Sequence, residues 1–501
     1  MDAKTLFLWL LILPFAGAIL TYLVGRVAVI RKVKNNPARW LAFIVFVMAD
    51  YIFITLAQQF LVTGPIDLVY GTVALQFDGI SLVLGGSALL LGTLASFFSI
   101  DYIAGDIGEE KFYAMVISMV AAVVGLSCAN DLFNLWIWFE IMAITSYMLV
   151  AFYSTQPGSL EAGVKYLVQS ATGSILVLLG IALVFMVTGE TNLDTIQKTT
   201  AASSMILLAA GALFIIGFGV KAALVPMHTW LPDAHSQAPS GVSALLSGIV
   251  IEAGLIAMLR ALGALTHISL SWGIILLIFG ALNMTYGNLM ALRQNQVKRL
   301  LAFSSLSHVG YMLIGFGTAI QFHVLDGAAG GFFHLITHTM MKGLAFLAAG
   351  ALLYALYIAR QKHGPLMLED LNGASHKYPM VALGFSVAVL GLGGLPPLAG
   401  FMSKWQIFVG GFETHNTWMI LLVVYAALNS VVSLGYYAPM VNHMYRLEPS
   451  AIVTEGKELG FLIQIPLVLL TSAIVALGLW PSAISFITTT AAAALLKGFG
   501  G

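Results

Sequence analysis

The feature that most constrains this 501-residue chain is a series of apolar runs, each about as long as a membrane-spanning helix. Hydrophobic residues make up 59% of the chain and charged residues 9%. Soluble proteins carry about 25% charged residues because their surfaces face water. The runs are too long and too continuously apolar for the alternating strands of a membrane barrel. The sequence therefore predicts an all-α integral membrane protein.

We expect about fourteen transmembrane helices in a single domain that covers residues 1–501. The apolar segments lie at 5–25, 40–62, 79–100, 112–129, 131–153, 164–188, 204–226, 240–264, 270–291, 301–319, 329–358, 379–411, 417–440 and 460–485.

The distribution of Lys and Arg between loops predicts the orientation, because cytoplasmic loops carry an excess of both. One side of the predicted bundle has Arg26, Arg31, Lys32, Lys34, Arg39, Lys111, Arg293, Lys298, Arg299, Arg360, Lys362, Lys377, Arg446 and Lys457. The other side has Lys4, Lys198, Arg260 and Lys497. We therefore expect the first side to face the cytoplasm, and both termini to lie on the outer side of the cytoplasmic membrane.

A few charged residues fall inside or at the ends of apolar segments. A charge at the bilayer centre costs at least ~2.5–3.5 kcal/mol, so such residues face a partner or a hydrated cavity and are functional candidates. They are Asp50, Glu140, Lys165, Lys221, Glu252, Lys342 and Lys404.

Glu140 and Lys221 are the strongest candidates in the first half of the chain. Glu140 follows the aromatic sequence Trp136-Ile-Trp-Phe. It is either a carboxylate that exchanges a proton or binds a cation, or one half of a structural ion pair. Lys221 precedes Pro226, which is expected to break the helix just beyond the lysine. The helix dipole favours the charged lysine there and burial disfavours it, which is typical of a switchable site.

Lys404 repeats this arrangement in the second half, since it follows an expected break at Pro396 and Pro397. Matched broken helices are typical of inverted repeats in transporters. We therefore expect two inverted five-helix repeats, helices four to eight over residues 112–264 and helices nine to thirteen over residues 270–440, with helices seven and twelve broken.

Three residues of the eleventh segment, His334, His338 and Lys342, recur every four residues and share one face of a helix. His308 in the preceding segment extends this row. The four residues are interpreted as a proton path, and the alternative is a set of core histidines bonded to their neighbours. We do not predict a metal site, because no third or fourth ligand can be placed.

Other polar residues have simpler interpretations. The sequence from His228 to His235 resembles a metal cluster in composition only, and we expect a loop in which Asp233 or Ser240 caps a helix. Lys165 follows Glu161 by four residues, which predicts a helix-end ion pair. Asp50 has no obvious partner.

Net charge and cysteine content exclude two further classes of function. The net charge is zero and no long basic run occurs, so nucleic acid is not an expected partner. Cys128 is the only cysteine, which excludes an internal disulfide and a Cys-ligated iron–sulfur cluster within this chain.

Four longer motifs resemble the antiporter-like subunit family, which includes the proton-channel subunits of complex I, the D-type subunit of Mrp antiporters and subunits of membrane-bound hydrogenases. They are Trp136-Ile-Trp-Phe-Glu140, Val220-Lys-Ala-Ala-Leu-Val-Pro-Met-His-Thr-Trp-Leu-Pro-Asp-Ala234, Lys298-Arg-Leu-Leu-Ala-Phe-Ser-Ser-Leu-Ser-His-Val-Gly-Tyr-Met312 and Gly394-Leu-Pro-Pro-Leu-Ala-Gly-Phe-Met-Ser-Lys-Trp405. The resemblance covers nearly the whole chain.

The resemblance implies fourteen helices, breaks in helices seven and twelve, and a charged axis in the membrane plane. It assigns Glu140, Lys221, Lys342 and Lys404 to that axis. Helix eight departs from the family, which usually has lysine or histidine where this chain has Glu252. This carboxylate is expected to pair with Lys221 or to help bind sodium.

Two functions follow as hypotheses. The first is proton or sodium/proton translocation by a subunit of a redox-driven complex of the complex I or hydrogenase type, with redox centres only in partner subunits. Its partners would include homologous antiporter-like subunits and membrane lipid. The alternative is a subunit of a stand-alone Mrp-type sodium/proton antiporter.

Overall fold

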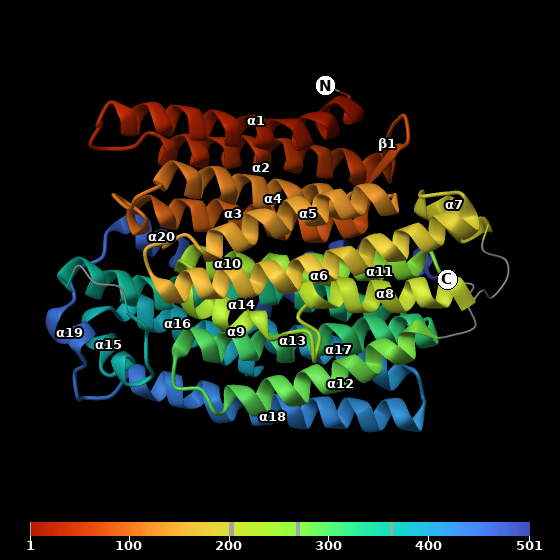
Figure 1. The fold of residues 1–501 in the computed structure, drawn as a ribbon. Helices are drawn as coiled ribbons and strands as arrows, with labels where there is room; N and C mark the ends of the chain where they lie inside the picture. The colour runs from red at the N-terminus through yellow and green to blue at the C-terminus, as the bar shows by residue number, and fades with distance from the viewer. Residues whose placement is uncertain (1, 200–204, 267–270, 361–363, 501) are drawn as a thin grey trace.

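A computed structural model describes residues 2–199, 205–266, 271–360 and 364–500. Within these residues the chain forms a bundle of long helices that lie roughly parallel or antiparallel to one another (Figure 1). Lys362, and the positions 204 and 270 at which two segments are expected to begin, lie outside the described residues.

Twelve helices in the described ranges are long and apolar enough to cross a membrane. They are α1 (Ala3–Ile30), α2 (Ala38–Thr63), α3 (Gly79–Tyr102), α4 (Glu109–Ser127), α5 (Leu132–Val150), α6 (Pro157–Thr188), the continuous helix made by α10 (Ser240–Leu245), the π-helical η1 (Leu246–Val250) and α11 (Ile251–Gly263), then α12 (Trp272–Ala291), α13 (Val297–Phe322), α14 (Leu325–Arg360), α18 (Thr417–Met444) and α20 (Phe461–Leu479).

The two remaining predicted segments are broken helices, as expected for the seventh and twelfth. In the seventh, α8 (Met205–Lys221) ends at the lysine and α9 (Trp230–Gln237) follows the proline-containing break. In the twelfth, α16 (Pro379–Gly393) and α17 (Ala399–Glu413) are separated at Pro396 and Pro397. The all-helical fold with these two breaks confirms the predicted architecture.

Short elements connect the long helices. They are the antiparallel hairpin of β1 (Ile66–Tyr70) and β2 (Val73–Phe77), with Ile66 opposite Phe77, and α7 (Leu193–Thr199), η2 (Glu369–Leu371), α15 (Ala374–Lys377), α19 (Ala451–Glu455), η3 (Pro481–Ile484) and α21 (Ser485–Gly498).

The predicted end of the last segment, residue 485, is wrong. Helix α20 ends at Leu479, and Ser485–Gly498 form the separate helix α21. Pro481 explains the difference, because a proline disfavours the helical conformation of the residue before it. Trp480 accordingly leaves the helical region, at φ −134° and ψ 69°.

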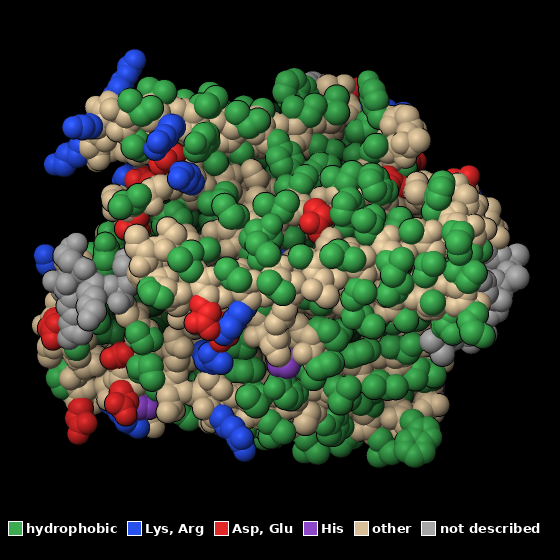
Figure 2. Space-filling model, viewed as in Figure 1, with side chains coloured by type: hydrophobic (Ala, Val, Ile, Leu, Met, Phe, Trp, Pro, Cys, Tyr) green, Lys and Arg blue, Asp and Glu red, His purple; other side chains and the backbone are tan. Residues whose placement is uncertain are grey.

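Figure 1 shows both termini near the end of the bundle that carries β1 and α7, whereas α15 and α19 lie at the opposite end. On the face in Figure 2, Lys and Arg side chains gather toward the end with α15 and α19, and the middle of the bundle is mainly hydrophobic. Two cations assigned above to loops lie instead in helices, with their side chains largely enclosed. Arg260 lies in α11 with 8% of its side chain exposed, and Lys298 is buried in α13, where its ammonium bonds the Ala238 carbonyl.

The helices differ in how far the protein encloses them. The central segments of α10–α11 and of α13 are 100% buried, whereas only 28% of the central segment of α18 is buried. Helix α14 packs against α13, α16 and α17. The protein interior therefore lies around α11, α13 and α14, away from any lipid.

Candidate functional site

Lys221 is the last residue of α8 and is buried among hydroxyl groups. Its ammonium donates to the Tyr166 hydroxyl at 2.8 Å and to Ser170 Oγ at 3.1 Å, both on α6. Ser146 Oγ on α5 lies 3.4 Å away, and the Tyr166 ring centroid lies 4.3 Å away. Neutral oxygens and an aromatic face therefore surround the cation.

The helix break positions this lysine. Trp230, the first residue of α9, donates its indole N–H to the Val220 carbonyl at 2.7 Å and stacks on Tyr166 with ring centroids 3.9 Å apart. Asn283 of α12 accepts the Val225 N–H at 2.9 Å. These contacts hold the unwound segment and use polar backbone groups that the break releases.

Glu140 lies on α5 and is half-buried, and one of its carboxylate oxygens has no hydrogen-bond partner within the described residues. It is not within 4.0 Å of Lys221, so no direct ion pair forms. An ionised Glu140 would act on Lys221 through space, because a Coulomb interaction does not need direct contact.

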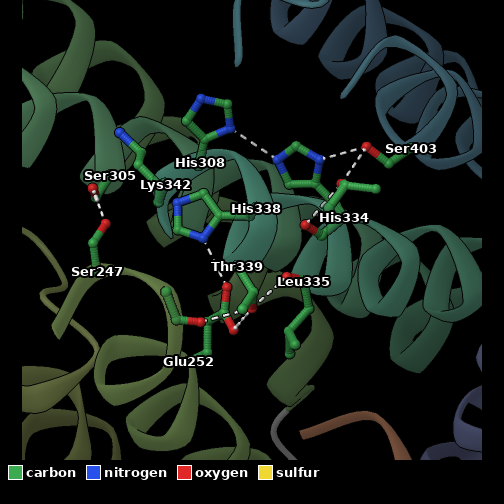
Figure 3. A network of polar contacts seen from close by, with 12 residues as sticks. Ser247, Glu252, Ser305, His308, His334, Leu335, His338, Thr339, Lys342 and Ser403 are labelled. Carbon is green, nitrogen blue, oxygen red and sulfur yellow. Dashed lines mark hydrogen bonds and ion pairs between the residues drawn. The ribbon is translucent and has the colours of Figure 1, made fainter. Parts of the chain in front are cut away.

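Glu252 does not contact Lys221, contrary to one of the two expectations for it. It lies two residues after η1 and is completely buried, with one carboxyl oxygen 2.7 Å from His338 Nδ1 and the other 2.9 Å from Thr339 Oγ1 (Figure 3). Both partners belong to α14, so this pair of contacts joins α11 to α14.

The histidines form a second chain. His308 Nδ1 lies 2.9 Å from His334 Nε2, and His334 Nδ1 lies 2.9 Å from Ser403 Oγ on α17 (Figure 3). His308 Nε2 lies 3.3 Å from the Tyr437 hydroxyl of α18. Each histidine can accept at one nitrogen and donate at the other, so the row from Tyr437 to Ser403 is a possible proton relay.

The ammonium groups of Lys342 and Lys404 have different surroundings, and within the described residues neither has a carboxylate within 4.0 Å. The Lys342 ammonium donates to the Leu301 carbonyl at 2.8 Å and to the Ser304 hydroxyl, which also contacts Tyr437. The Lys404 ammonium donates to the Leu392 carbonyl at 2.8 Å and to Ser430 Oγ at 2.9 Å. Leu392 is at the end of α16, where carbonyls lack helical partners and a cation is favoured.

These contacts make four separate groups in the described part of the chain. The hydroxyls around Lys221 form the first, Glu252 with His338 and Thr339 forms the second, Lys342 with the histidine chain and Ser403 forms the third, and Lys404 with Ser430 forms the fourth. His338 Nε2 is buried without a partner within the described residues, at the boundary between the second and third groups. Any proton path across the bundle therefore needs water or side-chain movement between the groups.

The sequence missed the hydroxyl residues of this network, among them Ser146, Tyr166, Ser170, Ser403 and Tyr437. Ser403 could have been found from its place next to Lys404. The others occur in apolar helices as ordinary residues, without a pattern that separates them from packing residues.

The remaining predictions have mixed outcomes. Lys165 forms the predicted ion pair with Glu161 at 2.7 Å and also contacts Asp233 at 3.2 Å. Asp50, which lacked an obvious partner, accepts from Thr93 Oγ1 at 2.7 Å.

The predicted helix caps at Asp233 and Ser240 are wrong. Asp233 lies inside the first turn of α9 and pairs with Lys165 and Arg299, and Ser240 is already the first residue of α10. Among the described residues, no group of three or more His, Cys, Asp or Glu side chains is arranged to hold a metal ion.

Comparison with known proteins identifies the family. Residues 129–429 match the family described as NADH:quinone oxidoreductase/Mrp antiporter, transmembrane region. The chain belongs to this family.

Similar proteins include subunit N of the F(420)H(2) dehydrogenase of Methanosarcina mazei, which is 34% identical over 395 residues, covering 77% of this chain and 78% of the relative. Subunit N of the NADH-quinone oxidoreductase of Desulfitobacterium hafniense is 30% identical over 407 residues, which cover 77% of this chain and 79% of that relative.

A solved structure shares the fold over almost the full length. A chain of the membrane-bound sulfane sulfur reductase, an archaeal respiratory membrane complex, superposes with a TM-score of 0.86 at 26% identity and covers 98% of both chains. The protein is therefore an antiporter-like membrane subunit of the type found in complex I-type respiratory complexes, and it crosses the membrane many times.

Proposed function

We propose that this antiporter-like subunit translocates protons across the cytoplasmic membrane as part of a redox-driven complex. The observation that carries the proposal is the set of buried polar groups at the level of the two helix breaks, from Glu140 on α5 to Lys404 on α17. Buried ionisable residues are costly inside a membrane and are retained for ion paths or proton relays. The enclosed position of α11, α13 and α14 gives these groups a lipid-free interior.

Transport begins with Glu140 and Lys221. While Glu140 is ionised, its field favours the protonated form of Lys221. When a neighbouring subunit or a conformational change draws the Glu140 charge away, Lys221 releases its proton toward Glu252 and His338. The proton then moves over His308, His334 and Lys342 to Lys404, and it leaves the protein near Lys404.

The same proposal includes the internal symmetry and the orientation. Residues 112–264 and 270–440 form two inverted repeats, each with one broken helix and one buried lysine beside the break. Both termini lie on the outer side, because the end of the bundle with α15 and α19 carries most of the loop cations.

The relatives named above support a redox complex over a stand-alone Mrp-type antiporter. Both are subunits of dehydrogenases, and the solved structure comes from a respiratory complex. Partner chains would be other membrane subunits, including homologous antiporter-like subunits, together with chains that hold the iron–sulfur or other redox centres.

Purification of the native complex through a tag on this chain tests the assignment. We expect co-purifying subunits with cysteine-ligated clusters, and proton uptake by liposomes that depends on electron transfer. Co-purification with small antiporter subunits alone would favour the Mrp-type alternative. A requirement for sodium during transport would show that sodium is the coupling ion.

Variants then test the path. Glu140→Gln and Lys221→Ala should each reduce proton transport per electron by at least about tenfold, since relay residues typically contribute 10²–10⁴-fold. Lys165→Met is the matched control, because its ammonium is half exposed and lies in a surface ion-pair group. Normal pumping by both Glu140→Gln and Lys221→Ala would rule out the path.

A further inference from the structure

The hydroxyl group of Thr339 lies close to three oxygen atoms in a completely buried part of the bundle. The distances from Thr339 Oγ1 are 2.7 Å to the Gly248 carbonyl, 2.9 Å to Glu252 Oε2 and 3.0 Å to the Leu335 carbonyl. Figure 3 shows Thr339 beside the Glu252 carboxyl group, with His338 on the other side of it. A hydroxyl group has a single hydrogen to donate, so it cannot satisfy three acceptors.

One assignment of hydrogens satisfies the two shortest of these contacts. The contact with Gly248 is the shortest and has the usual length of an O–H···O bond, about 2.7–2.8 Å. If Thr339 donates to Gly248, the 2.9 Å contact between Thr339 Oγ1 and Glu252 Oε2 still needs a hydrogen. Two oxygen lone pairs at that distance would repel each other in the absence of a proton. A proton on Glu252 Oε2 would supply this hydrogen, and each of the two contacts would then have one donor and one acceptor.

The other carboxyl oxygen fits the same assignment. Glu252 Oε1 lies 2.7 Å from His338 Nδ1, and the carbonyl oxygen of a carboxylic acid can accept there from a neutral imidazole. His338 Nε2 is buried with no partner, which a neutral ring nitrogen tolerates better than the N–H of an imidazolium. The consistent arrangement is a neutral His338 that donates to a protonated Glu252.

The groups around Glu252 do not supply a compensating positive charge. Lys221 at the end of α8 donates to hydroxyls of α5 and α6, and Lys342 on α14 donates to α13. Arg260 farther along α11 pairs with Asp78, and His308 on α13 bonds His334. Within the described residues, His338 is the only basic side chain within 4.0 Å of the Glu252 carboxyl group. A carboxylate there would remain a buried charge with one weak partner, which is costly.

The spacing of the oxygens also disfavours sodium as the occupant. Glu252 Oε2, Thr339 Oγ1 and the Gly248 carbonyl lie at hydrogen-bond distance from one another along a chain. An ion seated between them would have to contact each oxygen itself and would hold them farther apart.

We propose that Glu252 is a proton-storage site, which holds its proton on Oε2 through a hydrogen-bond chain from Glu252 to Thr339 to the Gly248 carbonyl. Thr339 is the positioning residue of this site. The inference rests on the proposed function for its role, since the stored proton would be the one passed on through His338. It assigns the ion at this position as a proton and replaces the expectation of sodium.

Infrared difference spectroscopy of the purified complex at rest tests the site without any transport. Wild-type and Glu252→Gln samples are compared at pH 7 in choline chloride and in sodium chloride, in H2O and in D2O. We expect the carbonyl stretching band of a protonated carboxylic acid, sensitive to D2O, in the wild type and in the control Glu140→Gln but not in Glu252→Gln. Thr339→Ser should keep the band position and Thr339→Val should shift it.

Two outcomes would overturn the inference. The first is a Glu252→Gln difference spectrum that lacks a carboxylic-acid band and shows the loss of a carboxylate band. The second is a band that disappears when sodium replaces choline at constant pH, which would make sodium the occupant. Because the protein does not turn over in this measurement, either result is independent of whether the subunit pumps.

Discussion

At the scale of single residues, Lys221 shows how a membrane protein keeps a buried ammonium group without a directly bonded carboxylate. Three hydroxyls from α5 and α6 accept its hydrogens, and the Tyr166 ring adds a cation–π contact. Hydroxyl oxygens can accept N–H hydrogen bonds from the lysine in both its charged and its neutral form. The surroundings therefore suit a group whose charge changes during a cycle.

Tyr166→Phe should slow proton transport by about tenfold, because the cation loses its shortest hydrogen bond, and a hydrogen bond to a charged group contributes about 1.5–3 kcal/mol. The aromatic face remains, so the protein should still assemble. Transport per electron in proteoliposomes measures the effect. Tyr425→Phe on α18 is the control, and equal rates for the two variants would contradict the role given to the Tyr166 hydroxyl.

Charged residues of the site could be predicted from the sequence because a charge in an apolar run is conspicuous. Lys221 and Lys404 lie at or near the predicted helix breaks, and Glu140 lies within the apolar helix α5. Their partners could not be predicted, since partner choice depends on how helices rotate against each other. Glu252 illustrates this, because its contact with His338 joins residues 86 positions apart in the chain.

A residue outside the membrane-spanning helices gives a pH-dependent prediction. Burial raises the pKa of Asp106, between α3 and α4, from 3.8 to about 6. Because the folded state favours the protonated acid, the Asp106 contribution to stability falls as the pH rises from about 4 to 6 and stays low above pH 6. Asp106→Asn should raise the melting temperature at pH 7.5 and have little effect at pH 4. An equal change at both pH values would refute this origin.

At the scale of elements, the broken twelfth helix depends on close packing by α20. A Cβ atom added to Gly478 would lie 1.9 Å from the Pro397 carbonyl oxygen and 2.7 Å from the Ala399 nitrogen. These are backbone atoms of the break itself, so they cannot move aside as a flexible side chain does. The absence of a side chain at Gly478 lets α20 support the break that positions Lys404.

Gly478→Ala should therefore lower the melting temperature and slow transport, because overpacking of this kind costs about 1–3 kcal/mol and displaces the break. Gly498→Ala is the matched control, since an added Cβ there meets nothing within 4 Å. Thermal unfolding followed by tryptophan fluorescence measures stability. Two variants of equal stability would show that the break does not need this contact.

The long helices and both breaks could be predicted from apolar length and proline positions, whereas α21 and the β1–β2 hairpin could not. The sequence from Ser485 to Gly498 is apolar but shorter than a membrane span, and nothing local indicates that it packs against α3 and α14. For this reason the predicted last segment, residues 460–485, includes Ser485, which is the first residue of α21.

At the scale of the whole molecule, a largely enclosed ion pair links α3 and α4 to α11. Arg260 of α11 donates to both carboxylate oxygens of Asp78, which caps α3, at 2.9 and 3.0 Å, and to the Ser127 carbonyl that ends α4 at 2.6 Å. The count of loop cations assigned Arg260 to the outer side of the bundle. Its position near the end of an apolar segment does not reveal that its side chain is enclosed.

Arg260→Met should destabilise the protein by about 3–5 kcal/mol, since it leaves the Asp78 charge buried without its partner. The double variant Arg260→Met with Asp78→Asn should recover part of that loss. Lys165→Met should change stability by less than about 1 kcal/mol, as exposed ion pairs do. Chemical denaturation in detergent compares the three, and a double variant no more stable than Arg260→Met would contradict the assignment.

The length of α14 has a mechanical consequence. Its 36 residues extend about 54 Å at 1.5 Å per residue, whereas the hydrocarbon layer is about 30 Å thick. The helix is thus longer than the lipid layer is thick, and it carries His334, His338 and Lys342 on one face. A displacement of α14 along its axis would move all three groups together, so a movement that starts at one end of the bundle would change the middle of the proposed path.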